Sequence, residues 1–156
     1  MSDIASIIAK FVENAEKIAI LGLGNRLRGD DAAGLLVCEY IKGKVRADIF
    51  LAETAPESYA LKLLDGGYSH VIIVDTAISN YPPGTIFIVD KNRLLEITIT
   101  THSIPITLLV EILEAHNINV LIVGISPKYT PLSENISPPV RQAIEKLSKM
   151  LLDILS

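Results

Sequence analysis

The chain has 156 residues, of which 49% are hydrophobic and 21% charged, and its formal net charge is -4 at pH 7. These values predict one domain over residues 1–156 with a substantial core, and they exclude a disordered or low-complexity chain. The acidic balance also argues against nucleic-acid binding, because the sequence has no basic run to neutralise phosphates.

The predicted elements alternate between helix and strand. Strands are expected at 17–23, 47–53, 70–75, 85–90 and 119–125, and helices at 1–16, 31–41, 57–65, 105–116 and after Ser137. The helix at 1–16 is expected to be an extension of the domain. Only the stretch TAISNYPPG separates the third and fourth strands, which is too short for a helical crossover, so the fourth strand should be antiparallel. The pattern predicts a three-layer α/β fold, with a mostly parallel five-stranded sheet, one antiparallel strand and helices on both faces.

The cellular setting is predicted from the single cysteine and the apolar runs. Cys38 cannot form a disulfide within the chain, which is typical of a reducing compartment. The first helix carries Asp3, Lys10 and Glu13 among its apolar residues, unlike a signal peptide. No apolar run reaches the roughly 18 residues that a membrane span needs. We therefore expect a cytoplasmic protein without membrane insertion.

Three chemically active residues should meet at one edge of this sheet. Asp31 follows the first strand, Asp75 ends the third, and His102 precedes the helix at 105–116. Ligands of such sheets bind beyond the carboxyl ends of the strands, and residues 96–101 are expected to bring His102 back to that edge. Two carboxylates and an imidazole can bind a divalent transition metal while leaving coordination positions open.

Ordinary structural roles remain open for the same residues. Asp31 could cap its helix, although Asp30 is the better placed cap. Asp75 could form a turn, and His102 could be a solvated loop residue.

The remaining histidines and the cysteine are weaker candidates. His70 begins a strand, and His116 ends a helix, where a cation suits the helix dipole. Cys38 lies in an almost wholly apolar helix and is expected in the core.

A dinucleotide-binding domain is one alternative function. Gly22 and Gly24 follow a strand, and Glu53 ends the next strand, where a ribose-binding acid would lie. Leu27 stands at the third glycine position of that motif, however, and two aspartates occupy the place of the pyrophosphate, which disfavours this function.

Four segments in order resemble the maturation endopeptidases of nickel–iron hydrogenases. They are GLGNRLRGDDAAG at 22–34, VIIVDTAI at 71–78, PPGTI at 82–86 and TTHSIP at 100–105. The resemblance extends from about residue 17 to 145 and is greatest to the branch that processes formate-linked or membrane-bound hydrogen-evolving hydrogenases. Two departures are Ala32, where relatives usually have glycine, and Glu53–Thr54 in place of Asp-Gly.

The resemblance implies an endopeptidase that removes the C-terminal peptide of a hydrogenase large-subunit precursor after nickel insertion. It implies that Asp31, Asp75 and His102 are the functional residues. We expect all three to bind the nickel, and we expect the nucleophile to be a water that is either polarised by the metal or activated by one of the two aspartates. The nickel would arrive with the precursor and need not be present in the isolated protein. A monomer is expected, and a non-catalytic adaptor of hydrogenase assembly remains an alternative.

Overall fold

The structure, a computed structural model, describes residues 3–93, 103–128 and 135–156. The expected returning segment at 96–101 and His102 lie outside these ranges. The strands are β1 (Ile18–Leu23), β2 (Asp48–Glu53), β3 (His70–Thr76), β4 (Ile86–Ile88) and β5 (Asn119–Ile125). The α-helices are α1 (Asp3–Val12), α2 (Ala33–Ile41), α3 (Ala60–Asp65), α4 (Ser103–Ala115) and α5 (Pro138–Ile154), and short 3-10 helices are η1 (Gly29–Ala32), η2 (Pro56–Tyr59) and η3 (Lys91–Arg93).

The five strands form one sheet in the order β2-β1-β3-β5-β4. The pairs β1–β2, β1–β3 and β3–β5 are parallel, and β4 pairs with β5 in the antiparallel sense. The predicted fold class is therefore confirmed, including the antiparallel strand. The short connection after β3 does not make a hairpin with it, because β5 takes the place beside β3 and leaves β4 at the edge.

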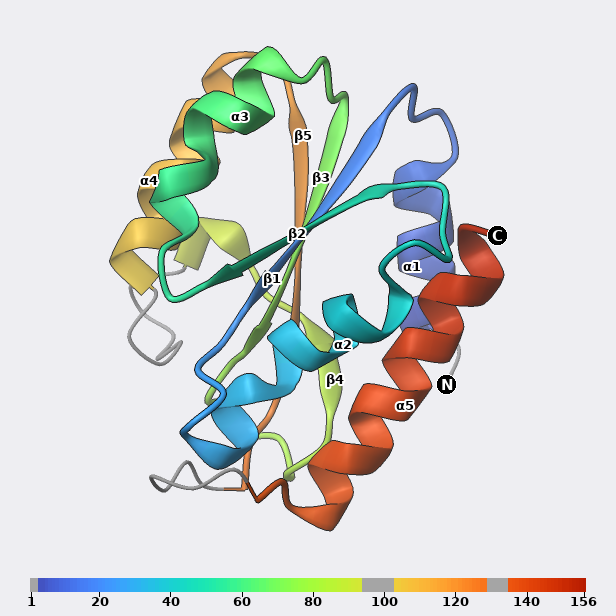
Figure 1. Cartoon of the computed structure of the whole chain (residues 1–156), viewed down its shortest axis with the longest axis vertical. Coiled ribbons are helices and arrows are strands. Elements are labelled where there is room, and N and C mark those ends of the chain that lie inside the picture. Colours follow the sequence, from blue (N-terminus) through green and yellow to red (C-terminus); the bar gives the residue numbers. More distant parts are fainter. Residues whose placement is uncertain (1–2, 94–102, 129–134) are drawn as a thin grey trace.

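Helices cover both faces of the sheet. In Figure 1, α3 and α4 lie on one side of the strands, and α1, α2 and α5 lie on the other. Side chains of β3 alternate between the two cores: Val71 and Ile73 pack with the first group, and Ile72 and Val74 with the second. This double burial explains why the middle of β3 is a continuous apolar run.

Most predicted boundaries agree with the structure to within two residues. The helix predicted over 1–16 is shorter, because it ends at Val12, and two other helices begin differently. The helix predicted over 31–41 begins with the 3-10 turn η1, and the one predicted over 57–65 is divided into η2 and α3. Both segments follow the carboxyl ends of strands, where the chain must turn sharply before a regular helix can start. Among the described helices, none is long and apolar enough to cross a bilayer.

Candidate active site

The turn after β1 places Asp31 at the carboxyl end of the sheet. Gly24 has a φ of 149°, and a Cβ atom there would lie 2.4 Å from the carbonyl oxygen of Asp31. The amide of Asn25 donates to that same oxygen at 3.2 Å, and the side chain of Asn25 accepts from the amide of Leu27 at 2.9 Å. Only glycine allows the chain to fold back this closely, so the turn depends on Gly24.

The start of α2 lies against the ends of two strands. A Cβ atom on Gly34 would come within 2.2 Å of the carbonyl oxygen of Val74 and 2.7 Å of that of Leu23. In addition, the hydroxyl of Thr76 donates to the carbonyl oxygen of Asp30 at 2.8 Å. The segment that carries Asp31 is thus in direct contact with the end of β3, which carries Asp75.

Both candidate carboxylates are buried at this edge. Asp31 is 4% exposed and Asp75 is 1% exposed. The amide of Thr76 donates to Oδ1 of Asp75 at 2.8 Å and so helps to orient that carboxylate. The structure therefore brings Asp31 and Asp75 to neighbouring segments, as the topology predicted. His102, the third member, lies outside the described residues. Within those residues no three His, Cys, Asp or Glu side chains form a group that could hold a metal ion.

Asp30 has a different role from the predicted helix cap. Its carboxylate is 1% exposed and accepts three hydrogen bonds from residues far along the chain. The donors are the amide of Lys128 (2.9 Å), the amide of Ser137 (2.8 Å) and the hydroxyl of Ser137 (2.7 Å). The capping prediction was wrong because these groups, which only the tertiary structure brings near, satisfy the carboxylate. Ser137 is the N-cap residue of α5 as predicted, but its hydroxyl bonds Asp30 rather than its own helix.

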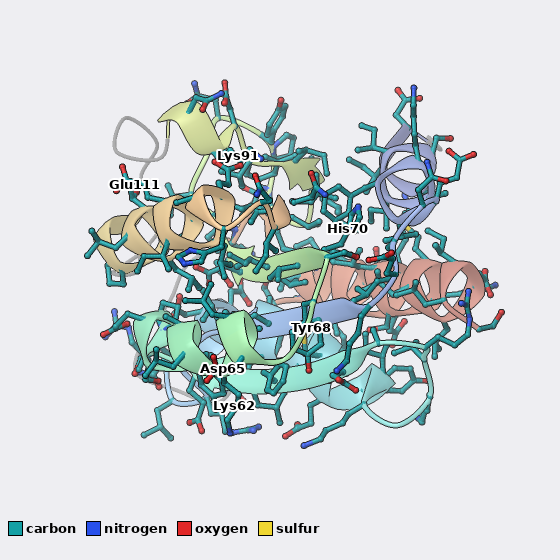
Figure 2. The ribbon with its side chains drawn as sticks, turned by 90° about the horizontal axis from the view of Figure 1, so that it is seen from above. Lys62, Asp65, Tyr68, His70, Lys91 and Glu111 are labelled. Carbon is teal, nitrogen blue, oxygen red and sulfur yellow. The ribbon has the colours of Figure 1, made fainter. Side chains whose placement is uncertain are left out.

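The two described histidines lie at the opposite end of the sheet. Figure 2 views the molecule from the end at which β3 begins and shows His70 there, near Tyr68. The Nδ1 atom of His70 is 2.8 Å from the hydroxyl of Ser69, and its ring packs edge-on against Phe11. His116 follows α4, and its Nδ1 atom is 2.9 Å from the carbonyl oxygen of Ile112. Neither histidine is on the edge that holds Asp31 and Asp75.

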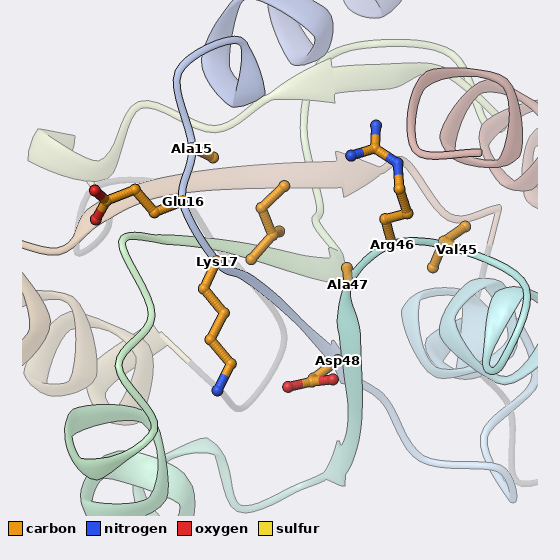
Figure 3. Close-up of a pocket in the computed structure, with 8 residues that line it drawn as sticks. Ala15, Glu16, Lys17, Val45, Arg46, Ala47 and Asp48 are labelled. Atoms are coloured by element: carbon orange, nitrogen blue, oxygen red, sulfur yellow. The ribbon is translucent and has the colours of Figure 1, made fainter.

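A pocket of about 390 Å³ also lies at the amino ends of the strands (Figure 3). It is lined by residues 15–18 and 45–48. Three of its charged side chains make structural contacts: Lys17 donates to the carbonyl of Gly66 at 2.7 Å, Arg46 to that of Ser156 at 2.7 Å, and Asp48 accepts from Tyr68 at 2.6 Å. This pocket is therefore separate from the candidate carboxylates.

Cys38 does not supply a nucleophile. It is fully buried and unpaired, and burial raises the pKa of its thiol. A reactive cysteine needs the opposite environment, with access to solvent and a lowered pKa. The prediction that Cys38 belongs to the core is confirmed, and the buried aspartates remain the candidates for catalysis.

Comparison with known proteins identifies the family. A family model described as hydrogenase maturation protease matches residues 39–154. The chain belongs to this family. The matched range contains Asp75 and His102 and begins after Asp31. This family membership replaces the dinucleotide-binding and adaptor alternatives, and it makes the chain a hydrogenase maturation endopeptidase, which cleaves the C-terminus of a nickel–iron hydrogenase large subunit.

Individual relatives agree with this assignment. The hydrogenase 3 maturation protease of Escherichia coli K12 is 27% identical, over 85% of this chain and 86% of its own. The crystal structure of the [NiFe] hydrogenase maturation protease HycI from Thermococcus kodakarensis KOD1 has a TM-score of 0.84 and 29% identity, covering 96% of this chain and 98% of that one. The solution structure of an endopeptidase HycI from Escherichia coli has a TM-score of 0.79 and 27% identity, covering 88% and 90%. The similarity of this hydrogenase maturation protease to its relatives thus includes nearly the whole domain.

Proposed function

We propose that this endopeptidase recognises its precursor through the nickel ion that the precursor carries, and that Asp31, Asp75 and His102 bind that ion. The observation that carries the proposal is that the carboxylates of Asp31 and Asp75 are buried, at 4% and 1% exposure, on two segments that contact each other. Two carboxylates on adjacent segments supply the negative charge and the oxygen donors that a divalent transition metal binds. A nickel ion brought by the substrate is a cation of this kind.

His102 completes the proposed set of ligands. Imidazole is a good ligand for nickel, and carboxylates add charge and oxygen donors. The direction of α4 supports this choice, because α4 is followed by β5 at the amino-end edge and therefore begins toward the opposite edge. Ser103, the first residue of α4, directly follows His102. The helix also packs on η2, which follows the carboxyl end of β2.

Water is the proposed nucleophile. It adds to the carbonyl carbon of the scissile peptide bond, and Asp31 or Asp75 accepts its proton. The same carboxyl group then returns that proton to the leaving nitrogen as the C–N bond breaks. The substrate's nickel, when bound, supplies positive charge that stabilises the oxyanion. The amide of Thr76 holds the Asp75 carboxylate in place throughout.

The proposal is tested on a nickel-loaded large-subunit precursor, with cleavage followed by mass spectrometry. We expect Asp31→Asn, Asp75→Asn and His102→Ala each to lower kcat/KM by at least about 100-fold while far-UV circular dichroism stays unchanged. Asp48→Asn and His116→Ala are matched controls at the opposite edge and should cleave normally. The nickel-free precursor should remain uncut. Normal cleavage by all three site variants, or of the nickel-free precursor, would contradict the proposal.

The proposal also includes the cellular compartment and the oligomeric state of the enzyme. The free thiol of Cys38 is compatible with the reducing cytoplasm, where we propose that a monomer meets the precursor. The measurement is the mass of the purified protein in solution by light scattering, for which the monomer value is 17.0 kDa.

A further inference from the structure

The buried residue Asp30 is hydrogen-bonded through its carboxylate and its main chain to three separate parts of the chain. Its side chain accepts hydrogen bonds from Lys128, which follows β5, and from Ser137, which precedes α5. Its carbonyl oxygen accepts from the hydroxyl of Thr76 at the end of β3. Asp31 is its neighbour in η1. One residue thus joins the segment after β1, the end of β3 and the two ends of the connection between β5 and α5.

These connections lead directly to both candidate catalytic carboxylates. Thr76, which is fully buried, donates its hydroxyl to Asp30 at 2.8 Å and its amide to Oδ1 of Asp75 at 2.8 Å. The main chain of Asp31 is held in the turn after β1. Its amide donates to the carbonyl oxygen of Arg28, and its carbonyl oxygen accepts from the amide of Asn25. A displacement of Asp30 would therefore move Asp31 and Asp75 relative to each other.

We propose that Asp30 is a positioning residue for peptide cleavage: it fixes the relative placement of Asp31 and Asp75 without itself contacting the substrate. This inference rests on the proposed function of those two residues. The reason is geometric. Both oxygens of the Asp30 carboxylate are already used by donors from Lys128 and Ser137, and the side chain is 1% exposed. A misplacement of about 1 Å at a reacting group can cost about 100-fold in rate, so holding such groups in place is a catalytic requirement.

Asp30→Asn tests this role with little change of shape. An amide has one acceptor oxygen, so its NH₂ group must face either the amide of Ser137 or the amide of Lys128, and one bond is lost. Ser137→Ala is a milder variant that removes only the hydroxyl bond of 2.7 Å. Asp48→Asn is the matched control, because its carboxylate also accepts a short side-chain hydrogen bond, from Tyr68 at 2.6 Å, but at the opposite edge.

Kinetics on the nickel-loaded precursor distinguish positioning from simple stabilisation. We expect Asp30→Asn to lower kcat by about 10- to 100-fold with KM within about threefold, and Ser137→Ala to lower kcat less. Asp48→Asn should keep the kcat of the natural protein. Rates are divided by the folded fraction, measured by circular dichroism. A folded Asp30→Asn variant with normal kcat, or an equal loss in Asp48→Asn, would overturn the inference.

Amide hydrogen exchange gives a readout that needs no substrate. In the natural protein the amides of Lys128 and Ser137 should be protected, and Asp30→Asn should speed the exchange of at least one of them by about tenfold or more. Exchange at the rate of an unstructured peptide in the natural protein would overturn the geometry. The proposed function fails in a different way, namely when the natural protein leaves the precursor uncut or Asp75→Asn cuts it normally.

Discussion

Cys38 shows how closely α2 packs on β1. A Cβ atom on Gly22 would lie 2.8 Å from the sulfur of Cys38, so the thiol fills the space that this glycine leaves. Because burial raises its pKa, the thiol should not react with a disulfide reagent in the folded protein and should react fully after denaturation.

The corresponding prediction is that Cys38→Ala cleaves the precursor at the natural rate. The variant should lose about 1 kcal/mol of unfolding free energy through the small cavity it creates. Cleavage assays and urea unfolding measure the two effects. Loss of kcat in a folded Cys38→Ala protein would show that the thiol takes part in the reaction.

His70 gives the protein a pH-dependent contribution to stability. Burial lowers its pKa below the ordinary value of 6.5, and its ring is surrounded by Ser69, Phe11 and Asn119. Between the lowered pKa of His70 in the folded protein and the ordinary value of 6.5, the unfolded chain binds more protons at this residue than the folded chain does. The stability from neutral His70 is thus complete above that range and is lost as the pH falls through it.

We expect the urea midpoint to fall more between about pH 7.5 and about pH 5.5 in the natural protein than in His70→Gln. Equal slopes in the natural protein and His70→Gln would mean that another group causes the change.

At the scale of elements, the docking of α2 onto the strand ends places the candidate site. Gly34 allows the helix to approach the carbonyl oxygens of Val74 and Leu23, and a methyl group would come within 2.2 Å of the former. Since backbone atoms cannot move aside cheaply, α2 would have to shift away from β1 and β3.

Gly34→Ala should therefore lower the free energy of unfolding by about 2–4 kcal/mol and reduce cleavage together with it. Glu39→Ala is the control on the same helix. It removes only the ion pair with Arg26. Because the side chains of Arg26 and Glu39 are 42% and 46% exposed, the loss should lower the free energy of unfolding by less than about 1 kcal/mol. Urea unfolding measures both. A Gly34→Ala protein as stable as Glu39→Ala would show that the contact is easily relieved.

At the scale of the whole molecule, the two hydrophobic cores share one sheet. Neighbouring residues of β3 point to opposite faces, with Ile73 in the core under α3 and α4 and Ile72 in the core under α1, α2 and α5. Neither helical layer can separate without exposing the same strands to water. The cores should therefore unfold together.

We expect a single urea transition in which far-UV circular dichroism and tyrosine fluorescence coincide. Ile72→Val and Ile73→Val should each lower the unfolding free energy by about 1 kcal/mol without separating the two signals. Two distinct transitions, each sensitive to only one of these substitutions, would show that the layers unfold independently.

Sequence alone was sufficient for the fold class and for the placement of two of the three candidate residues. The length and spacing of the apolar runs predicted five strands and the antiparallel sense of β4, because hydrophobic periodicity and connection length are local properties. The same pattern placed Asp31 and Asp75 at the carboxyl edge, since parallel strands bring their ends together. The position of Ser137 before α5 was also readable, because N-caps follow local rules.

Only the tertiary structure decided what the residues around that site bind. The neighbouring sequence predicted a helix cap at Asp30, but its donors, Lys128 and Ser137, are about 100 residues away in the sequence. Likewise, β4 pairs with β5 rather than β3, because β5 lies beside β3 and separates it from β4. Local patterns fix where a helix or strand forms, whereas the partner of a buried polar group depends on contacts between distant segments, which no local pattern contains.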